Sequence, residues 1–334
     1  MSATEPTEQP MAETRSRGLR ISKDNWRIVY AFLAAILLFV TGEFVHPGFA
    51  SLGSIESILT IASFVGLAAA GQTFVILIGG IDLSSPWVLN GAAILMATSS
   101  LGQDGRSLYA LALTLGMGAL AGAANGVGIA FFGAPAVVMT LAMNGIMEGL
   151  TLGASSGMTC ASCASYAPPI VQAAVHGTFL GVPLALYLWL AVIVIVSFAL
   201  SFTRFGRNVY AIGNNSLASY LAGVNVRATT VILYMLSGIF SALAGIALVG
   251  FGGQASLGMG NPYLFQSIAA VVIGGVYILG GRGHYLGAVA GSVSLVTLVS
   301  VLMTVNMPEY GRSIIYGAAI LVLLLLYGRE QEEA

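Results

Sequence analysis

Long apolar stretches separated by short polar or glycine-rich segments make up most of this chain. A helix that crosses a bilayer needs about 20 predominantly apolar residues. Ten stretches approach that length, at 28–45, 55–79, 86–101, 107–132, 135–153, 184–202, 227–250, 263–280, 285–305 and 312–328. The pattern predicts an all-α fold, a polytopic membrane bundle of about ten transmembrane helices. The stretch 86–101 is the shortest and contains polar residues.

Three segments do not fit the spanning pattern. Residues 1–24 are rich in Thr, Glu, Pro, Ser and Arg and lack apolar periodicity, so we expect a disordered cytoplasmic tail, followed by a single transmembrane domain over 25–330. The segment at about 154–183 has no Lys or Arg and is expected to be an external loop.

The third segment, about 204–227, is too polar to span but carries apolar residues at helical spacing. We expect a short amphipathic helix on the cytoplasmic face, with its N-cap at Asn214 to Ser216 and Gly223 near its end. The alternative is a helix that lies on lipid headgroups.

The arginines test the helix count independently, because cytoplasmic loops are enriched in Lys and Arg. Ten helices and a cytoplasmic N-terminus place these residues inside: Arg204, Arg207, Arg227, Arg282 and Arg329. Only Arg106 and Arg312 then fall outside. Both termini are therefore expected in the cytoplasm.

Composition narrows the function classes. Hydrophobic residues make up 57% and charged residues 7% of the 334, and the net charge is −1. The bilayer is thus the expected surrounding, and nucleic acid is not an expected partner. Two cysteines, Cys160 and Cys163, and three scattered histidines do not form a metal-ligand pattern, so no metal is expected.

An ATPase site of the P-loop type is excluded by a missing residue. That loop needs a lysine after its glycines to reach the nucleotide phosphates, and the only lysine of the chain, Lys23, follows Leu19-Arg20-Ile21-Ser22. If ATP powers a process here, a separate subunit hydrolyses it.

Two glycine-rich bends have similar sequences. Residues 75–81 (VILIGGI) resemble residues 271–276 (VVIGGV), and each run closes an apolar stretch. Transporters are often built from repeats, but such short runs also arise by chance in this composition.

Three further patches resemble a known family, the ribose-type ABC sugar permeases. The stretch 213–226 (GNNSLASYLAGVNV) resembles the cytoplasmic coupling motif of that family. Residues 267–275 (SIAAVVIGG), followed by 280–283 (GGRG), form a second likeness. The third is a glycine-rich motif matched by Gly71, Thr73, Val75, Ile76, Gly79, Gly80, Ile81, Asp82, Leu83 and Ser84.

The resemblance implies the permease subunit of an importer that passes a monosaccharide-like solute across the bacterial inner membrane. It implies three protein partners: a cytoplasmic ATPase subunit with two nucleotide-binding modules, which holds ATP and Mg²⁺; a periplasmic substrate-binding protein; and a second permease copy. This chain would need no cofactor and would not be an enzyme. The residues expected to couple to the ATPase are Gly213, Asn215, Leu217, Ala218, Leu221, Gly223 and Asn225.

The chain departs from the family in the coupling motif. Where the family usually has two acidic residues, this chain has Ser216 and Leu217. Where the family usually has a basic residue, this chain has Tyr220. The attachment to an ATPase is therefore expected to be apolar.

A sugar pathway needs amides, hydroxyls and aromatic faces. Candidate lining residues are Gln72, Asn90, Asn125, Asn144 and Phe131. Such amides also simply join helices by hydrogen bonds.

Two acidic residues in or beside spans are further candidates. Asp82 or Ser84 is expected either to cap the helix that starts at Ser85-Pro86 or to take part in gating. Glu148, in the fifth stretch, lies either near the outer membrane surface or against a pairing partner.

Other classes remain as alternatives. An ion-coupled secondary transporter or channel for a small polar solute would need relays of acidic or histidine side chains. A membrane-embedded enzyme would need a convergent catalytic set, and none is visible in the sequence.

Overall fold

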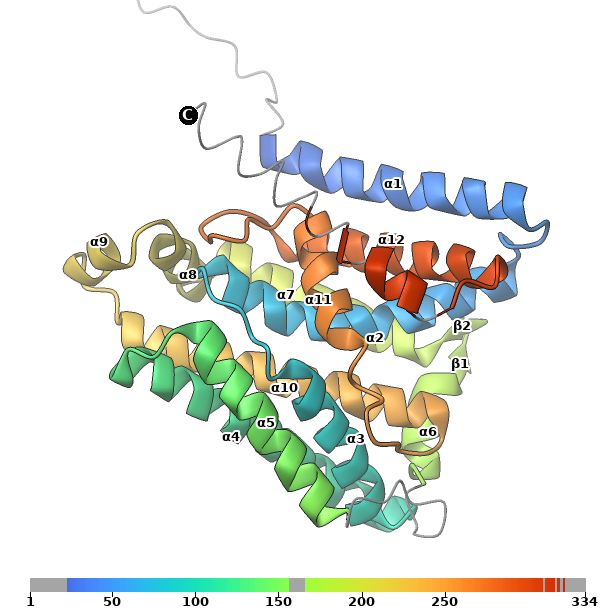
Figure 1. Cartoon of the computed structure of the whole chain (residues 1–334), viewed down its shortest axis with the longest axis horizontal. Helices are drawn as coiled ribbons and strands as arrows, with labels where there is room; N and C mark the ends of the chain where they lie inside the picture. Colours follow the sequence, from blue (N-terminus) through green and yellow to red (C-terminus); the bar gives the residue numbers. More distant parts are fainter. Residues whose placement is uncertain (1–22, 156–165, 309, 316, 319–320, 322–334) are drawn as a thin grey trace, which may run out of the picture.

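The protein is a helical bundle with a roughly triangular outline (Figure 1). The computed structural model describes residues 23–155, 166–308, 310–315, 317–318 and 321. Its long helices are α1 (Lys23–Val45), α2 (Leu52–Leu77), α3 (Ser85–Ser100), α4 (Ser107–Phe132), α5 (Ala136–Ala154), α7 (Leu184–Phe202), α10 (Val226–Gly252) and α12 (Tyr285–Thr304). Shorter pieces are the 3₁₀ turn η1 (Asp104–Arg106), α6 (Pro169–His176), the hairpin β1 (Thr178–Phe179) and β2 (Val182–Pro183), α8 (Arg204–Asn214), α9 (Ser216–Leu221) and α11 (Tyr263–Ile273).

The all-α membrane bundle is confirmed, while the count of ten spans is not. Within the described residues seven helices are long and apolar enough to cross a membrane: α1, α2, α4, α5, α7, α10 and α12. The expected span 86–101 is the 16-residue α3. The expected span 263–280 is wrong in extent, because α11 ends at Ile273 where Gly274 and Gly275 turn the chain. Most of the expected span 312–328 lies outside the described residues.

Two expectations concern segments that are only partly described. Most of the expected tail, residues 1–22, lies outside the described residues, and Lys23 already belongs to α1. In the expected external loop 154–183, α6 and the β1–β2 hairpin are described. Cys160 and Cys163 lie outside the described part.

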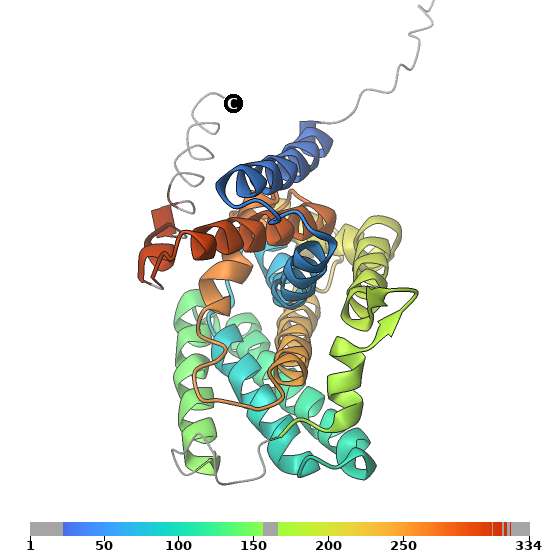
Figure 2. The same ribbon diagram turned by 90° about the vertical axis from the view of Figure 1, so that its right-hand side faces the viewer.

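Helix α2 is the centre of the bundle. Every residue from Ala62 to Leu77 is buried, and α7, α10, α11 and α12 surround it. Helix α1, by contrast, packs mainly on α12 and is exposed along most of its length (Figure 2). Many apolar side chains stay on the outer surface of the bundle, as a lipid-facing surface requires.

Helices α4 and α10 pack backbone against backbone. Gly118, Gly122 and Gly126 lie four residues apart on one face of α4 and meet the backbone of α10. A side chain at Gly122 would overlap the carbonyl of Tyr234. This spacing of small residues lets two membrane helices approach closely, and dispersion contacts then hold them together.

The substitution Gly122→Leu is expected to lower the unfolding temperature of the protein in detergent by about 1–4 °C, because overpacking a helix contact costs about 1–3 kcal/mol. Gly116→Leu is the matched control on the same helix, since a side chain there meets open space. Equal unfolding temperatures for the two variants would contradict the packing role of Gly122.

The bends after α2 and α11 share one geometry. Gly79 and Gly275 have positive φ angles of 78° and 82°. The amide of Gly80 donates to the carbonyl of Val75 at 3.0 Å, and the amide of Val276 donates to that of Val271 at 3.2 Å. These are the bonds of a Schellman helix ending. The two similar runs, 75–81 and 271–276, therefore form two copies of the same turn.

Candidate functional site

The segment between α2 and α3 is non-helical backbone inside the bundle. It leaves α2 near α8 and returns to the middle of the molecule before α3 begins (Figure 1). Gln72 of α2 holds it in place: its Nε2 donates to the carbonyl of Asp82 at 2.5 Å, and its Oε1 accepts from the amide of Asp82 at 3.4 Å. Since Gln72 and Asp82 are both buried, these bonds satisfy backbone groups that water does not reach.

The carboxyl group of Asp82 connects the segment before α3 to α10 and, through Ser84, to α4. Its Oδ1 accepts from the amide of Ser84 at 3.0 Å and from the Ser84 hydroxyl at 2.5 Å, while its Oδ2 accepts from Ser237 of α10 at 2.6 Å. Ser84 accepts in turn from Nδ2 of Asn125, on α4, at 2.9 Å. We call Gln72, Asp82, Ser84, Asn125 and Ser237 the polar network.

The capping geometry at α3 differs from the simple expectation. Ser84 is the N-cap residue and Pro86 lies in the first turn, but the Ser84 side chain accepts no hydrogen bond from α3. Its hydroxyl points to Asp82 instead. The hydrogen bonds of Asp82 therefore join the segment before α3 to α10.

The substitution Asp82→Ala is expected to destabilise the protein by at least about 2 kcal/mol, because the hydroxyl of Ser237 and the amide of Ser84 lose their buried acceptor. Asp82→Asn keeps the shape and one carbonyl acceptor and should fall between the alanine variant and wild type. Thermal unfolding in detergent measures both. An alanine variant as stable as wild type would contradict the role of the network.

Three glycine-rich pieces of backbone meet beside the end of α2. The amide of Gly281 donates to the carbonyl of Leu77 at 2.8 Å. Gly213, in the last turn of α8, lies so close that a side chain there would overlap both of these groups. We call Leu77, Gly79, Gly213, Gly280 and Gly281 the glycine junction. At Gly213 and Gly280 main chain packs directly on main chain, and the Asn214 side chain also contacts Gly281.

Helix α8 is also held to the same bend by side chains. The hydroxyl of Tyr210 donates to the carbonyl of Gly283 at 2.8 Å, and Nδ2 of Asn214 donates to that of Gly281 at 3.3 Å. The sequence predicted only one short helix in 204–227. The structure has two, because Arg204–Asn214 is itself amphipathic and buries Gly206, Val209 and Ile212 against the bundle.

Helix α9 is the predicted short helix and projects from one end of the molecule (Figure 1). Asn215 is its N-cap and accepts from the amide of Ala218 at 2.9 Å, and Gly223 follows its end with a φ of 87°. Asn225 caps α10 in the same way, accepting from Ala228 at 3.0 Å. Of the expected coupling residues, these three therefore shape the segment.

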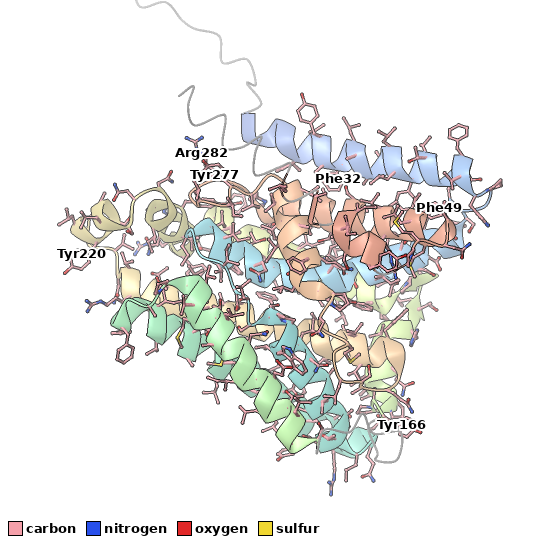
Figure 3. The ribbon with its side chains drawn as sticks, viewed as in Figure 1. Phe32, Phe49, Tyr166, Tyr220, Tyr277 and Arg282 are labelled. Atoms are coloured by element: carbon pink, nitrogen blue, oxygen red, sulfur yellow. The ribbon has the colours of Figure 1, made fainter. Side chains whose placement is uncertain are left out.

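The outward surface of α9 is apolar. Leu217, Tyr220 and Leu221 are 67%, 67% and 77% exposed, and Ala218 is also exposed. Figure 3 shows Tyr220 at the outer end of the bundle. We call Leu217, Ala218, Tyr220 and Leu221 the knob. Four neighbouring exposed side chains without a charge form a surface typical of an interaction site.

The expected pathway residues separate into three groups. Gln72 and Asn125 belong to the polar network. Asn90 is fully buried, and neither atom of its amide has a hydrogen-bond partner among the described residues; the same holds for Oδ1 of Asn125 and Oδ1 of Asn144. Phe131 is 58% exposed, and the guanidinium carbon of Arg227 lies 5.7 Å from its ring centroid.

Helix α5 has an outer face without a partner in this structure. Gly145, Gly149 and Gly153 lie four residues apart, and a side chain at each would meet nothing within 4 Å. Asn144 and Glu148 flank this face and are half-buried. Figure 2 shows α5 along one edge of the molecule and α7 along the opposite edge.

Sequence reasoning missed the contribution of α10 to the network. Ser237 bonds Asp82, and Ser241, one turn later, lies 2.8 Å from the hydroxyl of Ser85. Two serines four residues apart on one face of an apolar helix were the available signal. They indicate a polar stripe directed at another helix rather than at lipid.

Comparison with known proteins agrees with this arrangement. Residues 54–324 match the family described as "Branched-chain amino acid transport system / permease component". The ribose import permease protein RbsC of Escherichia coli K12 is 32% identical over 303 residues, which is 90% of this chain and 94% of that protein. RbsC of Haemophilus influenzae is 31% identical over 88% of this chain and 91% of the relative. The autoinducer 2 import system permease protein LsrC of E. coli K12 / DH10B is 32% identical over 91% of this chain and 88% of the relative.

The seven apolar helices and the family match together identify a multi-pass membrane permease. The chain belongs to the permease-component family matched over residues 54–324. Its relatives are named as permease proteins of ribose import and of autoinducer 2 import.

Proposed function

We propose that this chain is the transmembrane permease subunit of an ATP-driven importer that passes a monosaccharide-like solute across the bacterial inner membrane. The observation that carries the proposal is the knob, an exposed apolar surface joined to the bundle through the glycine junction. The similarity to ribose and autoinducer 2 import permeases supports the solute class.

The knob is the docking surface for a separate ATPase subunit with two nucleotide-binding modules, which holds ATP and Mg²⁺. Its face carries no charge, so burial of apolar area supplies most of the attachment energy. Closure of the ATPase would push α9, and α8 would pass the movement to the bend after α2 as a rigid body.

The same end of the bundle is the cytoplasmic one in this proposal. Arg204 and Arg207 of α8, Arg227 of α10 and Arg282 all lie in segments joined at that end. This follows the enrichment of arginine on the cytoplasmic side of membranes. We propose that both termini are cytoplasmic as well, and a periplasmic binding protein would deliver the solute at the opposite end.

A second copy of this chain would cover the outer face of α5. A carboxyl group and an amide beside a lipid-facing surface are costly, whereas a protein partner can satisfy them. The open stripe of Gly145, Gly149 and Gly153 suits close approach of two helices. The solute would then pass beside the two α5 helices, within reach of Asn144 and Glu148.

The unpartnered amides support a neutral, hydroxyl-rich solute. Buried polar atoms are normally hydrogen-bonded, so Asn90 and Asn125 have unused capacity on the inner side of α3 and α4. Sugar hydroxyls, or the waters that accompany them, can use this capacity. Asp82 then stabilises the segment that moves and does not contact the solute.

Reconstitution tests the proposal. Liposomes that contain the chain together with the ATPase and binding protein of its importer should accumulate a labelled monosaccharide only when ATP is supplied. Liposomes that contain the chain alone should not concentrate any solute. Accumulation by the chain alone, driven by an ion gradient, would establish the secondary-transporter alternative and overturn the proposal.

Cysteine cross-linking tests the second copy. In a chain with Cys160→Ser and Cys163→Ser, the variant Gly149→Cys is expected to form a disulfide-linked dimer in membranes, because the two glycine stripes would face each other. Leu190→Cys, on the exposed side of α7, is the matched control and should stay monomeric. Equal cross-linking of both variants, or of neither, would count against an α5 interface.

A further inference from the structure

A cavity of about 490 Å³ opens beside the glycine junction, between α1, α7, α8 and the bend that precedes α12. It lies outside the polar network and the knob. The side chains that line it are Ile28, Ser201, Tyr210, Arg282, His284 and Leu286. None of them is acidic, and the remaining wall is glycine backbone.

The hydrogen bonds of His284 leave Ser201 as a donor. Nδ1 of His284 accepts from the amide of Leu286 at 3.1 Å, so the ring proton lies on Nε2. Nε2 is 2.8 Å from the hydroxyl oxygen of Ser201 and donates to it. The hydroxyl proton of Ser201 is therefore available to a ligand. Burial lowers the pKa of His284, which favours this neutral ring.

The backbone adds further donors. The amides of Arg282, Gly283 and His284 are consecutive and bond to no described residue. The Arg282 side chain is exposed and has no ion-pair partner in the described part of the chain. Figure 3 shows Arg282 at the surface, between α8 and the start of α1. One guanidinium, one hydroxyl and a run of free amides suit an anion with several oxygen acceptors.

The cavity lies where three spans end together. Ile28 opens the apolar part of α1, Ser201 is the second-last residue of α7, and Leu286 is the second residue of α12. Because these spans start or stop at one level, the cavity is at the boundary between lipid and water. Ile28 and Leu286 add an apolar border to a wall of donors.

We propose that this cavity binds the phosphate group of an anionic phospholipid, with an acyl chain of that lipid against Ile28 and Leu286. The headgroup would connect the bend at Arg282 to the end of α7 and to α8. A bound lipid then stabilises the glycine junction from the membrane side. The site does not depend on which solute the protein carries.

Native mass spectrometry of the purified full-length chain tests the site. After delipidation, the chain is titrated with phosphatidylglycerol and, separately, with phosphatidylcholine. Wild type is expected to retain one phosphatidylglycerol. Arg282→Gln is expected to bind it about tenfold more weakly, because a charge-assisted contact is lost. Ser201→Ala removes one neutral donor and should give a smaller loss in the same direction.

The controls separate this site from general attraction of lipid to charge. Arg207→Gln removes an exposed arginine of α8 that does not line the cavity, and its lipid retention should equal that of wild type. Equal loss in Arg207→Gln and Arg282→Gln, or no loss in either, overturns the proposal. Inorganic phosphate is titrated in a parallel arm with thermal unfolding as readout. If phosphate stabilises the chain as much as phosphatidylglycerol does, and the Arg282→Gln variant loses this stabilisation, the cavity binds a free anion. That result would overturn the proposal of a lipid site.

Discussion

Substitution of both Leu217 and Leu221 with aspartate is expected to abolish ATP-dependent uptake while the chain remains in the membrane. The two side chains are 67% and 77% exposed on α9, and no described helix covers them. Burying each leucine against a partner contributes about 2 kcal/mol, so two charged replacements should weaken ATPase binding by at least about 100-fold. Co-purification of the ATPase subunit and uptake into liposomes measure the two effects.

The control for this prediction keeps the apolar character of the knob. Leu217→Met with Leu221→Met preserves volume and should retain ATPase binding and uptake within a few-fold. Because α9 is outside the bundle, the aspartate variant should unfold at the same temperature as wild type. Undiminished co-purification of the ATPase with the aspartate variant would place the docking surface elsewhere.

The substitution Gly213→Ala is expected to separate docking from transport. A methyl group there would overlap the carbonyl of Leu77 and the amide of Gly281, so α8 must move away from both bends. The knob itself is unchanged. The ATPase should therefore still co-purify, whereas uptake per ATP hydrolysed should fall by about tenfold or more, since overpacking costs about 1–3 kcal/mol.

A glycine in open space provides the control. Gly53→Ala, in the first turn of α2 at the opposite end of that helix, meets nothing within 4 Å and should transport like wild type. If Gly213→Ala transports with wild-type efficiency, movement does not reach the bundle through the glycine junction.

The sequence predicted the parts of this fold that depend on local pattern. Apolar runs predicted α1, α2, α4, α5, α7, α10 and α12 because each is long enough to span alone. The N-cap at Asn215 and the turn at Gly223 were equally local. The end of α11 was missed because hydropathy continues through residues 274–280, whereas the two glycines there end the helix.

The candidate site was less accessible to sequence reasoning, because its contacts join distant segments. The hydrogen bond from Ser237 to Asp82 spans 155 residues, and nothing in either local pattern selects the other residue. Gln72 was selected as a possible pathway residue, and its hydrogen bond to the main chain of Asp82 was not predicted. A high glycine content likewise indicates close helix packing, but it does not identify the backbones in contact. The contact between Gly213 and Leu77 is an example that the sequence does not predict.

The glycine junction separates two properties that proteins often combine in one surface. Its contacts are mostly main chain to main chain, and the side chain that joins them, Asn214, belongs to α8, so they are independent of the side chains that face outward on α9. Substitutions on the knob should therefore allow the permease to bind a different ATPase subunit without a change in the contacts between α8 and the bundle. Exchange of Ser216–Leu221 between homologous permeases is thus a route to hybrid importers that keep this pathway and accept a foreign ATPase.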